Sequence, residues 1–297
     1  MAEPLLEVSG LSVELASERG PLRVLDGVDL ALHPNQTLGL MGESGSGKTL
    51  TALAVLNLLP PNARVVSGKV SHRGRRIGMV FQEPQAALNP VFTIGEQLVE
   101  AIRAHRGDTN PVELLRKVGL AEPELRAKQY PHQLSGGLRQ RVMVALALAS
   151  DPEVLIADEP TSALDVTVQA QLLELLKALQ RERQMAMVLI THDLALVAQQ
   201  ADAVAVMYAG RVVERGKPAD VFRSPRHPYT AGLVRCATGL TSKRGELPTI
   251  AGSVPAPGAW PSGCRFRERC DRQDASCAAL PPLVNDVACH HPLEARP

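Results

Sequence analysis

The first part of the chain carries stretches in which apolar and polar residues alternate, the pattern typical of strands that bury one face. Residues 5–15 and 22–32 are two such stretches, and the polar turn at 17–21 between them predicts an antiparallel hairpin. Other short runs are apolar throughout, which predicts strands buried on both faces. The further strands expected from these patterns cover residues 38–41, 65–70, 77–81, 154–157, 187–190, 203–208 and 211–214.

Between the strands the apolar period changes to that of a helix. Residues 165–183 show it most clearly, because leucines recur at i, i+3, i+4 and i+7, at positions 172, 175, 176 and 179. Residues 93–105, 111–118 and 142–149 are also expected to be helical. Strands that alternate with helices predict an α/β fold. The helix-rich piece at about 86–150 reads as an insertion, and the early hairpin as an antiparallel β part.

One stretch, residues 42–49, joins a predicted strand to a predicted helix and fits G-x-x-x-x-G-K-[ST]. Its glycines let successive backbone N–H groups point into one concavity, and the following helix adds the positive end of its dipole. Lys48 would place a charge near the β and γ phosphates, and Thr49 would offer a hydroxyl to Mg²⁺. The strand and helix on either side argue against an incidental glycine-rich turn. We expect nucleotide to bind at Gly42, Glu43, Ser44, Gly45, Ser46, Gly47, Lys48, Thr49 and Leu50.

Polar side chains follow three other predicted strands. Asp158 and Glu159 end one of them, where a carboxylate beside a phosphate loop can hold Mg²⁺ through water. Glu159 is placed to polarise an attacking water. Gln82 and His192 each follow an apolar strand and would face the same cleft. Any one of these residues taken alone would be an ordinary loop residue, so the prediction depends on the whole set.

A second anion site is predicted at Ser135, Gly136 and Gly137, which stand just before a helix. One ATP does not need two such sites in one chain. A second subunit would explain the pair, with Ser135 and the neighbouring N–H groups contacting a γ-phosphate held by the opposite chain.

Length, charge and hydropathy narrow the class of protein. The 297 residues allow one large domain or two medium ones, and a net charge of +1 gives no field that attracts nucleic acid. No apolar run approaches the roughly 18–20 residues that span a bilayer. The start of the chain has no basic-then-apolar signal peptide. We expect a cytosolic protein that reaches a membrane only through a partner.

Four of the five cysteines cluster near the end of the chain, at positions 264, 270, 277 and 289. In a reducing compartment such clustering favours metal over disulfides. Structural zinc sites usually contain a close C-x₂₋₄-C pair, which is missing here, whereas iron–sulfur clusters also take four thiolates and are less tied to one spacing. Zinc stays open, with His290 or His291 as substitute ligands. Free thiols or adventitious disulfides are the simpler alternatives.

The motifs at 42–49, Gln82, 134–137, 158–159, 162–165 and His192 occur in one order that resembles the ATP-binding subunits of ABC transporters, over roughly residues 5–235. The resemblance implies a P-loop NTPase core of the RecA-like type. It makes Glu159 the catalytic base and His192 a contact to the γ-phosphate. It implies Mg²⁺ held with Thr49, Gln82 and Asp158, and a role for Asp165 in a loop that communicates across a head-to-tail dimer.

Finer features resemble one branch of that family. Residues 81–90 and 226–230 are similar to the peptide/nickel importer group, and the cysteine-bearing tail is similar to that of oligopeptide and dipeptide importer subunits. The resemblance implies an ATP-binding domain at 1–235 and an extension at 236–297. It also favours a [4Fe–4S] cluster on Cys264, Cys270, Cys277 and Cys289.

The family implies partners and a place in the cell. We expect membrane-spanning permease subunits on which the helical insertion docks, a second ATPase subunit, and indirect cooperation with a solute-binding protein, at the cytoplasmic face of the membrane. A nickel or metallophore importer is the nearest alternative. A soluble ABC ATPase that acts on nucleic acid or ribosomes fits less well, since such chains usually carry two ATPase halves and only one phosphate loop is present.

Two positions depart from the family pattern. Leu138 follows Gly136-Gly137, where glutamine or methionine is usual, and leucine can still pack at a helix start. Leu15 stands where an aromatic residue usually stacks on adenine, and no aromatic residue precedes Phe81. We therefore expect weaker selection of the base.

Overall fold

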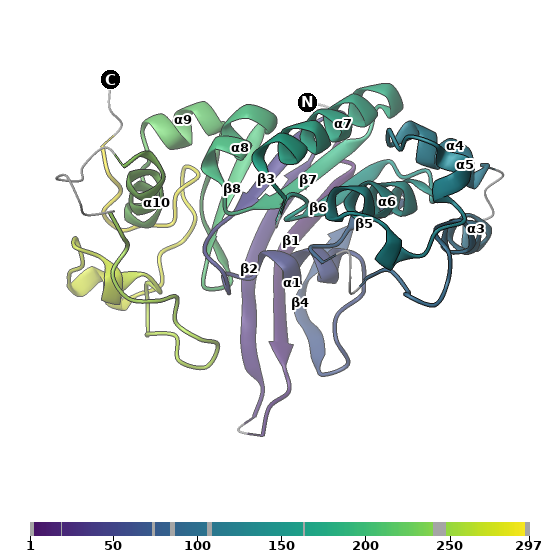
Figure 1. Ribbon diagram of the computed structural model, residues 1–297. Helices are drawn as coiled ribbons and strands as arrows, with labels where there is room; N and C mark the ends of the chain where they lie inside the picture. The colour runs from purple at the N-terminus through teal and green to yellow at the C-terminus, as the bar shows by residue number, and fades with distance from the viewer. Residues whose placement is uncertain are drawn as a thin grey trace. The chain divides into compact units, whose positions relative to one another are not determined.

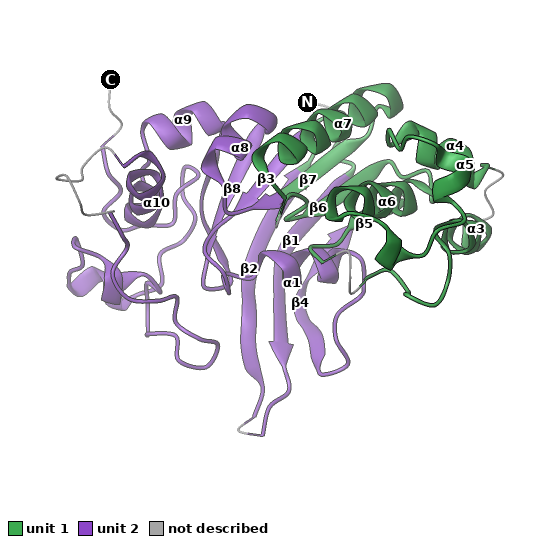
Figure 2. Cartoon of the chain, in the orientation of Figure 1, with its two compact units in different colours: residues 1–5, 32–36, 72–189 green, residues 6–31, 37–71, 190–297 purple. Residues whose placement is uncertain are grey.

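The computed structural model describes residues 3–18, 20–72, 75–83, 87–105, 109–162, 164–239 and 248–294. The chain divides into two compact units, which Figure 2 colours separately. Unit 1 holds residues 1–5, 32–36 and 72–189, and unit 2 holds residues 6–31, 37–71 and 190–297. Parts of two quoted motifs, residues 84–86 and residue 163, lie outside the described residues. So does the predicted start of the helical insertion.

Unit 1 is built on the strands that are apolar throughout. Its strand order is β5 (Ile77–Val80), β6 (Val154–Asp158) and β7 (Ala186–Thr191). β5 and β6 pair in parallel, and every residue of β6 and β7 is buried. The long helix α7 (Val166–Arg183) buries leucines 172, 176 and 179 in the core that contains Leu155 and Leu189. The predicted strands and helix are therefore confirmed. The spacing of the leucines in the sequence identified the buried face of α7.

The rest of unit 1 is helical, as the change of period predicts. It contains α3 (Ile94–Ala104), α4 (Pro111–Lys117), α5 (Pro123–Arg126), a 3₁₀ turn at Pro131–Gln133 and α6 (Gly136–Leu148), which lie together in Figure 1. Thr93 begins α3 with a capping box, because its side chain accepts from the N–H of Glu96 and the Glu96 carboxylate accepts from the N–H of Thr93. Helix α6 starts six residues earlier than its apolar part predicts, because the Ser135 side chain caps it.

Unit 2 contains a three-stranded sheet of order β2 (Leu22–Leu32), β1 (Leu6–Leu15) and β4 (Ala63–Ser71). The predicted hairpin is confirmed as neighbouring strands. Strand β4 pairs antiparallel with β1, with Leu15 opposite Ala63. Gly10 and Gly68 pass so closely that a Cβ on Gly68 would lie 2.4 Å from the Gly10 carbonyl carbon. This crossing explains a glycine in the middle of β4, where the residue type is otherwise unfavourable.

The other strands of unit 2 are β3 (Thr37–Met41), β8 (Ala203–Tyr208) and β9 (Arg211–Gly216). β3 and β8 pair in parallel, and β8 and β9 form the predicted antiparallel hairpin. The helices of this unit are α1 (Lys48–Val55), α8 (Leu194–Gln200), α9 (Pro218–Arg223) and α10 (Pro228–Thr238). Helix α10 runs across residue 235, which was predicted to end the first domain. The domain limits stay a prediction.

The cysteine-bearing segment belongs to unit 2 and shares its core. Short 3₁₀ turns at Arg267–Arg269 and Ala275–Ala278 are its regular elements among the described residues. Phe266 packs against Tyr208 and Tyr229, with ring centroids 5.3 and 5.5 Å apart. Cys264, Cys277 and Met41 join the same buried cluster. The end of the chain is therefore part of the packing that supports the strand before the phosphate loop.

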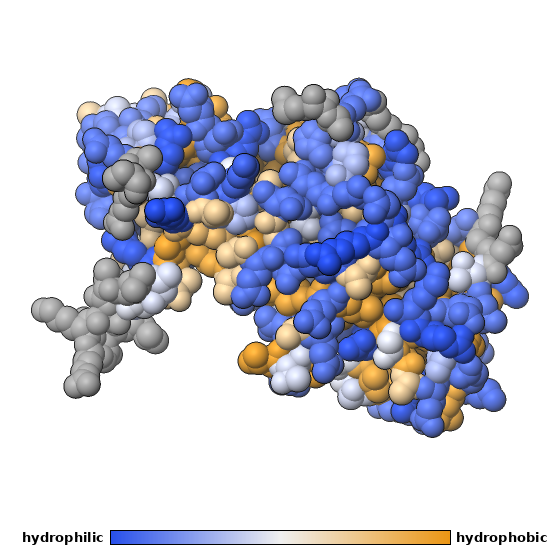
Figure 3. Space-filling model, turned by 90° about the horizontal axis from the view of Figure 1, so that it is seen from above, coloured by the Kyte–Doolittle hydropathy of each residue, from blue (hydrophilic) through white to orange (hydrophobic). Residues whose placement is uncertain are grey.

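One face of the molecule is mostly polar. Hydrophilic residues cover most of the face in Figure 3, and the hydrophobic residues exposed there form limited patches. Among the residues that the structure describes, none of the helices combines the length and the hydrophobicity needed to cross a membrane.

Candidate functional site

The phosphate loop of unit 2 runs from Gly42 to Gly47, between β3 and α1. Gly42, Gly45 and Gly47 have φ of +151°, +78° and +106°, a region that favours glycine. A Cβ on Gly42 would lie 2.2 Å from the carbonyl oxygen of Met207, and one on Gly47 would lie 2.7 Å from Leu25. Only glycine fits at these two positions, which explains that part of the motif.

Lys48 folds back over the loop. Its Nζ donates to the carbonyl oxygens of Gly42 at 2.9 Å and Glu43 at 3.0 Å, and the residue is 6% exposed. The N–H of Ser46 donates to the Glu43 carbonyl, and the Ser46 carbonyl accepts from the N–H of Gly210. Thr49, next along, is exposed. The ammonium group and the backbone thus form a compact cradle that is tied to the turn between β8 and β9.

Glu43 is the most constrained residue of this loop. Its N–H donates to the Tyr229 hydroxyl at 2.8 Å. Both of its carboxylate oxygens accept from Arg269, at 2.7 and 3.1 Å. Burial raises the pKa of Tyr229, and the hydrogen bonds that Arg269 donates to the Glu43 carboxylate are the main cause of a raised pKa of Arg269. Two residues of the last quarter of the chain therefore hold one residue of the phosphate loop.

Unit 1 brings together two of the predicted hydrolytic residues. The Gln82 side-chain amide donates to the Glu159 carboxylate at 3.4 Å, and the Ser162 hydroxyl donates to the carbonyl oxygens of both residues. Asp158 ends β6 and is 2% exposed. Glu159 has a φ of +44°, a left-handed conformation that costs a non-glycine residue about 1–3 kcal/mol.

The second predicted anion site also lies in unit 1. The Ser135 hydroxyl caps α6 by accepting from the N–H of Leu138 at 3.4 Å. Asp165 caps α7 by accepting from the N–H of Val168 at 3.0 Å. A Cβ on Gly137 would lie 2.8 Å from the Val168 side chain, so a glycine allows the two helix starts to meet. Ser135 and Gly136 are exposed and accessible to a partner.

His192 is found in unit 2, directly after β7, with an exposed side chain. The next residue, Asp193, caps α8 by accepting from two backbone N–H groups. The structure thus fixes the backbone around His192 and leaves the imidazole at the surface.

The four cysteines of the tail line one pocket, together with three histidines, at positions 227, 290 and 291. The N–H groups of Arg272 and His291 donate to the sulfurs of Cys270 and Cys289, both at 3.4 Å. Burial raises the pKa of Cys264 and Cys270, and raises that of Cys289 to about 11. Burial therefore favours the protonated form of these three thiols, and a bound metal would have to displace their protons.

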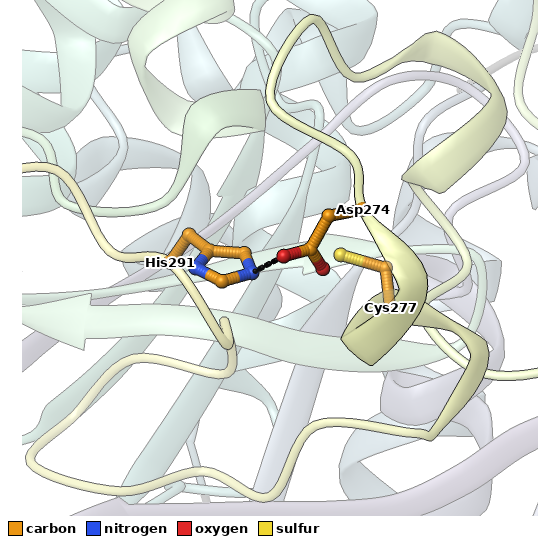
Figure 4. Close-up of side chains that lie close together, drawn as sticks. All are labelled: Asp274, Cys277 and His291. Carbon is orange, nitrogen blue, oxygen red and sulfur yellow. Dashed lines mark ion pairs between the residues drawn. The ribbon is translucent and has the colours of Figure 1, made fainter.

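One group within this region has the spacing of a mononuclear metal site. The ligand atoms of Asp274, Cys277 and His291 all lie within 4.8 Å of one another. Figure 4 shows the Cys277 sulfur directed towards the Asp274 carboxylate, which pairs with His291 at 2.9 Å. Hydrogen bonds from Ser276, and then from His291, lower the pKa of Asp274. In the described ranges no three cysteine sulfurs form such a group.

Sequence reasoning missed two arginines that stand beside Cys264 and Cys270. Arg265 donates to the carbonyl of Ala209 and to the carboxylate of Asp26, and its guanidinium lies 3.4 Å from the centre of the Trp260 ring. Burial lowers the pKa of Arg265 to about 10. Arg269 pairs with Glu43, as described above. The available signal was their place directly next to two cysteines, which a count of cysteine spacing does not use.

An open groove of about 860 Å³ runs along the helices of unit 1. Its lining includes Phe92, Val99 and Val112, with Glu96, Glu100 and Arg103 among its charged residues. Val91 and Phe92 at this end of the unit are 71% and 46% exposed. Exposed apolar residues beside a groove are typical of a surface that binds another protein.

Comparison with known proteins agrees with this geometry. Residues 25–162 match the ABC transporter family, and residues 213–277 match the C-terminal region of oligopeptide/dipeptide transporters. A protein of Brucella abortus (strain 2308), provisionally named a peptide import ATP-binding protein, is 46% identical, covering 95% of this chain and 92% of the relative. A Brucella melitensis protein with the same provisional name is 44% identical, covering 97% and 96%.

Solved structures give the same result. A dimeric ATP-binding cassette bound to ADP and Pi, in a post-hydrolysis state, has a TM-score of 0.62 at 27% identity and covers 72% of this chain and 98% of that one. The cbiO1 protein of Clostridium perfringens, part of an ABC transporter complex, has a TM-score of 0.60 at 26% identity, covering 74% and 91%. The fold and the nucleotide motifs thus define an ABC ATPase. The chain belongs to the ATP-binding proteins of the ABC transporter family, and the expected fold class is confirmed.

Proposed function

We propose that this chain is the ATP-hydrolysing motor subunit of an importer for oligopeptides or dipeptides. The approach of Gln82 to Glu159, at the strained end of β6, carries the ATPase part of the proposal. The C-terminal match and the provisionally named relatives support peptides as the cargo. The motor works at the cytoplasmic face of the membrane, bound to permease subunits that receive peptide from a solute-binding protein.

Each motif residue has a proposed role in hydrolysis. Residues 42–50 hold the phosphates, and Mg²⁺ would be held by Thr49, Gln82 and Asp158, where it would neutralise charge that develops on the phosphoryl oxygens. Glu159 accepts a proton from the attacking water, and His192 contacts the γ-phosphate. Asp158 fits a metal ligand because a nearly buried carboxylate ends a strand.

A second ATPase subunit completes the site. Ser135, Gly136 and Gly137 stand at an exposed helix start in which backbone N–H groups are free of intrahelical partners. They would bind the γ-phosphate held by the opposite subunit. Asp165 starts the neighbouring helix and would pass the state of one site to the other. The dimeric state of the solved cassette supports this arrangement.

The groove in unit 1 is the proposed contact with the permease. A transmembrane protein must offer a cytoplasmic element to this groove, and the exposed Phe92 and Val91 supply apolar area for it. The mix of Glu96, Glu100 and Arg103 along the lining would fix the orientation of that element.

The cysteine pocket is proposed to hold a structural [4Fe–4S] cluster on Cys264, Cys270, Cys277 and Cys289. A single zinc ion bound by several of these thiolates would draw their sulfurs to about 3.8 Å from one another, given tetrahedral bonds of about 2.3 Å. In the described residues no three cysteine sulfurs lie within 4.8 Å of one another, and an iron–sulfur cluster is larger than a single ion. Zinc on Asp274, Cys277 and His291 is the alternative that this geometry favours.

The first prediction separates nucleotide binding from hydrolysis. Glu159→Gln keeps the size of the side chain and removes the base, so we expect ATP binding to persist while hydrolysis falls ~10²–10⁴-fold. Lys48→Ala should instead lose ATP binding, because it removes the charge in the cradle. ATP titration and phosphate release on both variants test this. A Glu159→Gln protein that hydrolyses ATP at the wild-type rate would show that the base is elsewhere.

The second prediction concerns the cargo. The chain is purified with the permease subunits and the solute-binding protein of its own transporter, and ATP hydrolysis is measured in lipid vesicles. We expect di- or oligopeptides to stimulate hydrolysis and nickel or a nickel chelate to leave it unchanged. Stimulation by nickel alone would select the metal-importer alternative.

The third prediction concerns docking. Phe92→Ala removes apolar area from the groove, and we expect less permease to co-purify with the ATPase while ATP binding by the isolated chain is unchanged. Leu125→Ala is the matched control, since Leu125 is 49% exposed in the same helical region and does not line the groove. Equal recovery of permease by both variants would place the contact elsewhere.

The fourth prediction identifies the metal. After anaerobic purification we expect iron and acid-labile sulfide in equal amounts, with a visible absorption band that Cys277→Ser bleaches. Cys236→Ser is the matched control, because Cys236 lies in α10 and does not line the pocket. Stoichiometric zinc that is lost in both Asp274→Asn and His291→Ala would identify the mononuclear site instead.

A further inference from the structure

The phosphate loop contains an acidic residue, Glu43, although the triphosphate that the loop is expected to bind is itself an anion. Glu43 directly follows Gly42, and its carbonyl oxygen accepts from the Lys48 ammonium group, which is expected to contact the phosphates. A carboxylate in this place repels a triphosphate unless its charge is balanced. The side chain of Glu43 is 30% exposed, so water screens only part of that charge.

The balancing charge comes from the other end of the chain. Arg269, 226 residues later, donates to both carboxylate oxygens of Glu43 and is 6% exposed in its side chain. Its guanidinium also donates to the Tyr208 hydroxyl at 3.3 Å and to the carbonyl oxygens of Ile250, Ala251 and Gly252. The guanidinium is therefore held by a rigid set of acceptors, and the planar fork fixes the direction of the carboxylate.

We propose that Arg269 is a positioning residue for ATP binding, which acts by neutralising and anchoring Glu43 of the phosphate loop. The proposal rests on the ATP-binding role of residues 42–50. It gives the C-terminal extension a part in the nucleotide site, in addition to any metal that the extension binds.

The contacts around Glu43 explain how such an effect reaches the phosphates. The Glu43 backbone is tied to Tyr229 by its N–H and to Lys48 by its carbonyl oxygen. A carboxylate released from Arg269 would place an unpaired negative charge beside Lys48 and would compete with ATP for that ammonium. The effect should fall mainly on affinity, because the Arg269 pair acts on the phosphate loop and Glu159 remains the proposed base.

The position of Arg269 depends on the fold of the extension. It directly precedes Cys270, and its 3₁₀ turn begins after Phe266, which packs on Tyr208 and Tyr229. The same strip of chain therefore carries one wall of the cysteine pocket on one side and the partner of Glu43 on the other.

The test compares charge pairing at Glu43 in the full chain. ATP affinity is titrated calorimetrically for the wild type, Arg269→Gln, Glu43→Gln and the double variant Arg269→Gln/Glu43→Gln. We expect Arg269→Gln to raise the Kd for ATP about ten-fold, the size expected for one lost charged hydrogen-bond pair. In the Glu43→Gln background, Arg269→Gln should change the Kd for ATP by less than about two-fold, because no carboxylate is left at position 43 for the arginine to neutralise. In steady-state hydrolysis, Arg269→Gln should raise KM more than it lowers kcat.

Two further variants keep the result decisive. Glu43→Asp leaves the extension unchanged but shortens the carboxylate side chain, so that it no longer pairs with both guanidinium nitrogens. It should weaken ATP binding as Arg269→Gln does. This variant therefore tests the proposal even if Arg269→Gln fails to fold. Arg272→Gln removes an exposed positive charge from the same segment and should bind ATP normally.

The proposal is overturned if Glu43→Asp binds ATP like the wild type, if Arg269→Gln raises the Kd for ATP as much in the Glu43→Gln background as in the wild type, or if Arg272→Gln binds ATP as weakly as Arg269→Gln. A failure of the peptide-import proposal is recognised separately, because binding of ATP to the isolated chain requires neither permease nor peptide.

Discussion

The close approach of Gly42 to the carbonyl oxygen of Met207 is the constraint on which the phosphate loop depends. With 2.2 Å between that oxygen and any Cβ, the loop can pass β8 only as bare backbone. The same passage brings Ser46 to Gly210 and Gly47 to Leu25. The cradle is therefore shaped both by β2 and by the turn between β8 and β9. The concavity that binds phosphate is thus a product of tertiary packing as much as of the glycines themselves.

Charge balance is the second condition. Two carboxylates of unit 2, Asp26 on β2 and Glu43 in the loop, each pair with an arginine that stands next to a cysteine of the extension. Exposed ion pairs contribute little to stability, but the side chains of Arg265 and Arg269 are 8% and 6% exposed. Removing one partner of a buried pair leaves an uncompensated charge, which is far more costly than losing both partners. The extension and the core therefore depend on each other.

The parts of the fold set by local pattern were predictable from the sequence. Strand and helix periods located β6, β7 and α7, and the glycine motif located the loop, because each depends on neighbours in sequence. The partner of β4 and the capped start of α6 were not predictable in this way. β4 pairs with a strand some fifty residues earlier, with Leu15 opposite Ala63, and α6 opens on two glycines under a cap formed by Ser135. The Glu43–Arg269 pair spans 226 residues, so no local signal could indicate it.

A metal bound in the cysteine pocket would add to this dependence of the extension and the core on each other. Burial holds three of its thiols in the protonated form, so that metal binding must release protons and is therefore coupled to folding of the segment. Backbone N–H groups of Arg272 and His291 already point at two sulfurs, as they would to a thiolate. A segment stabilised by metal in this way would hold Phe266 against Tyr208 and Tyr229. It would also hold Arg269 beside Glu43. Such a metal would then help to fix Arg269, the cation that we propose balances the charge of the phosphate loop.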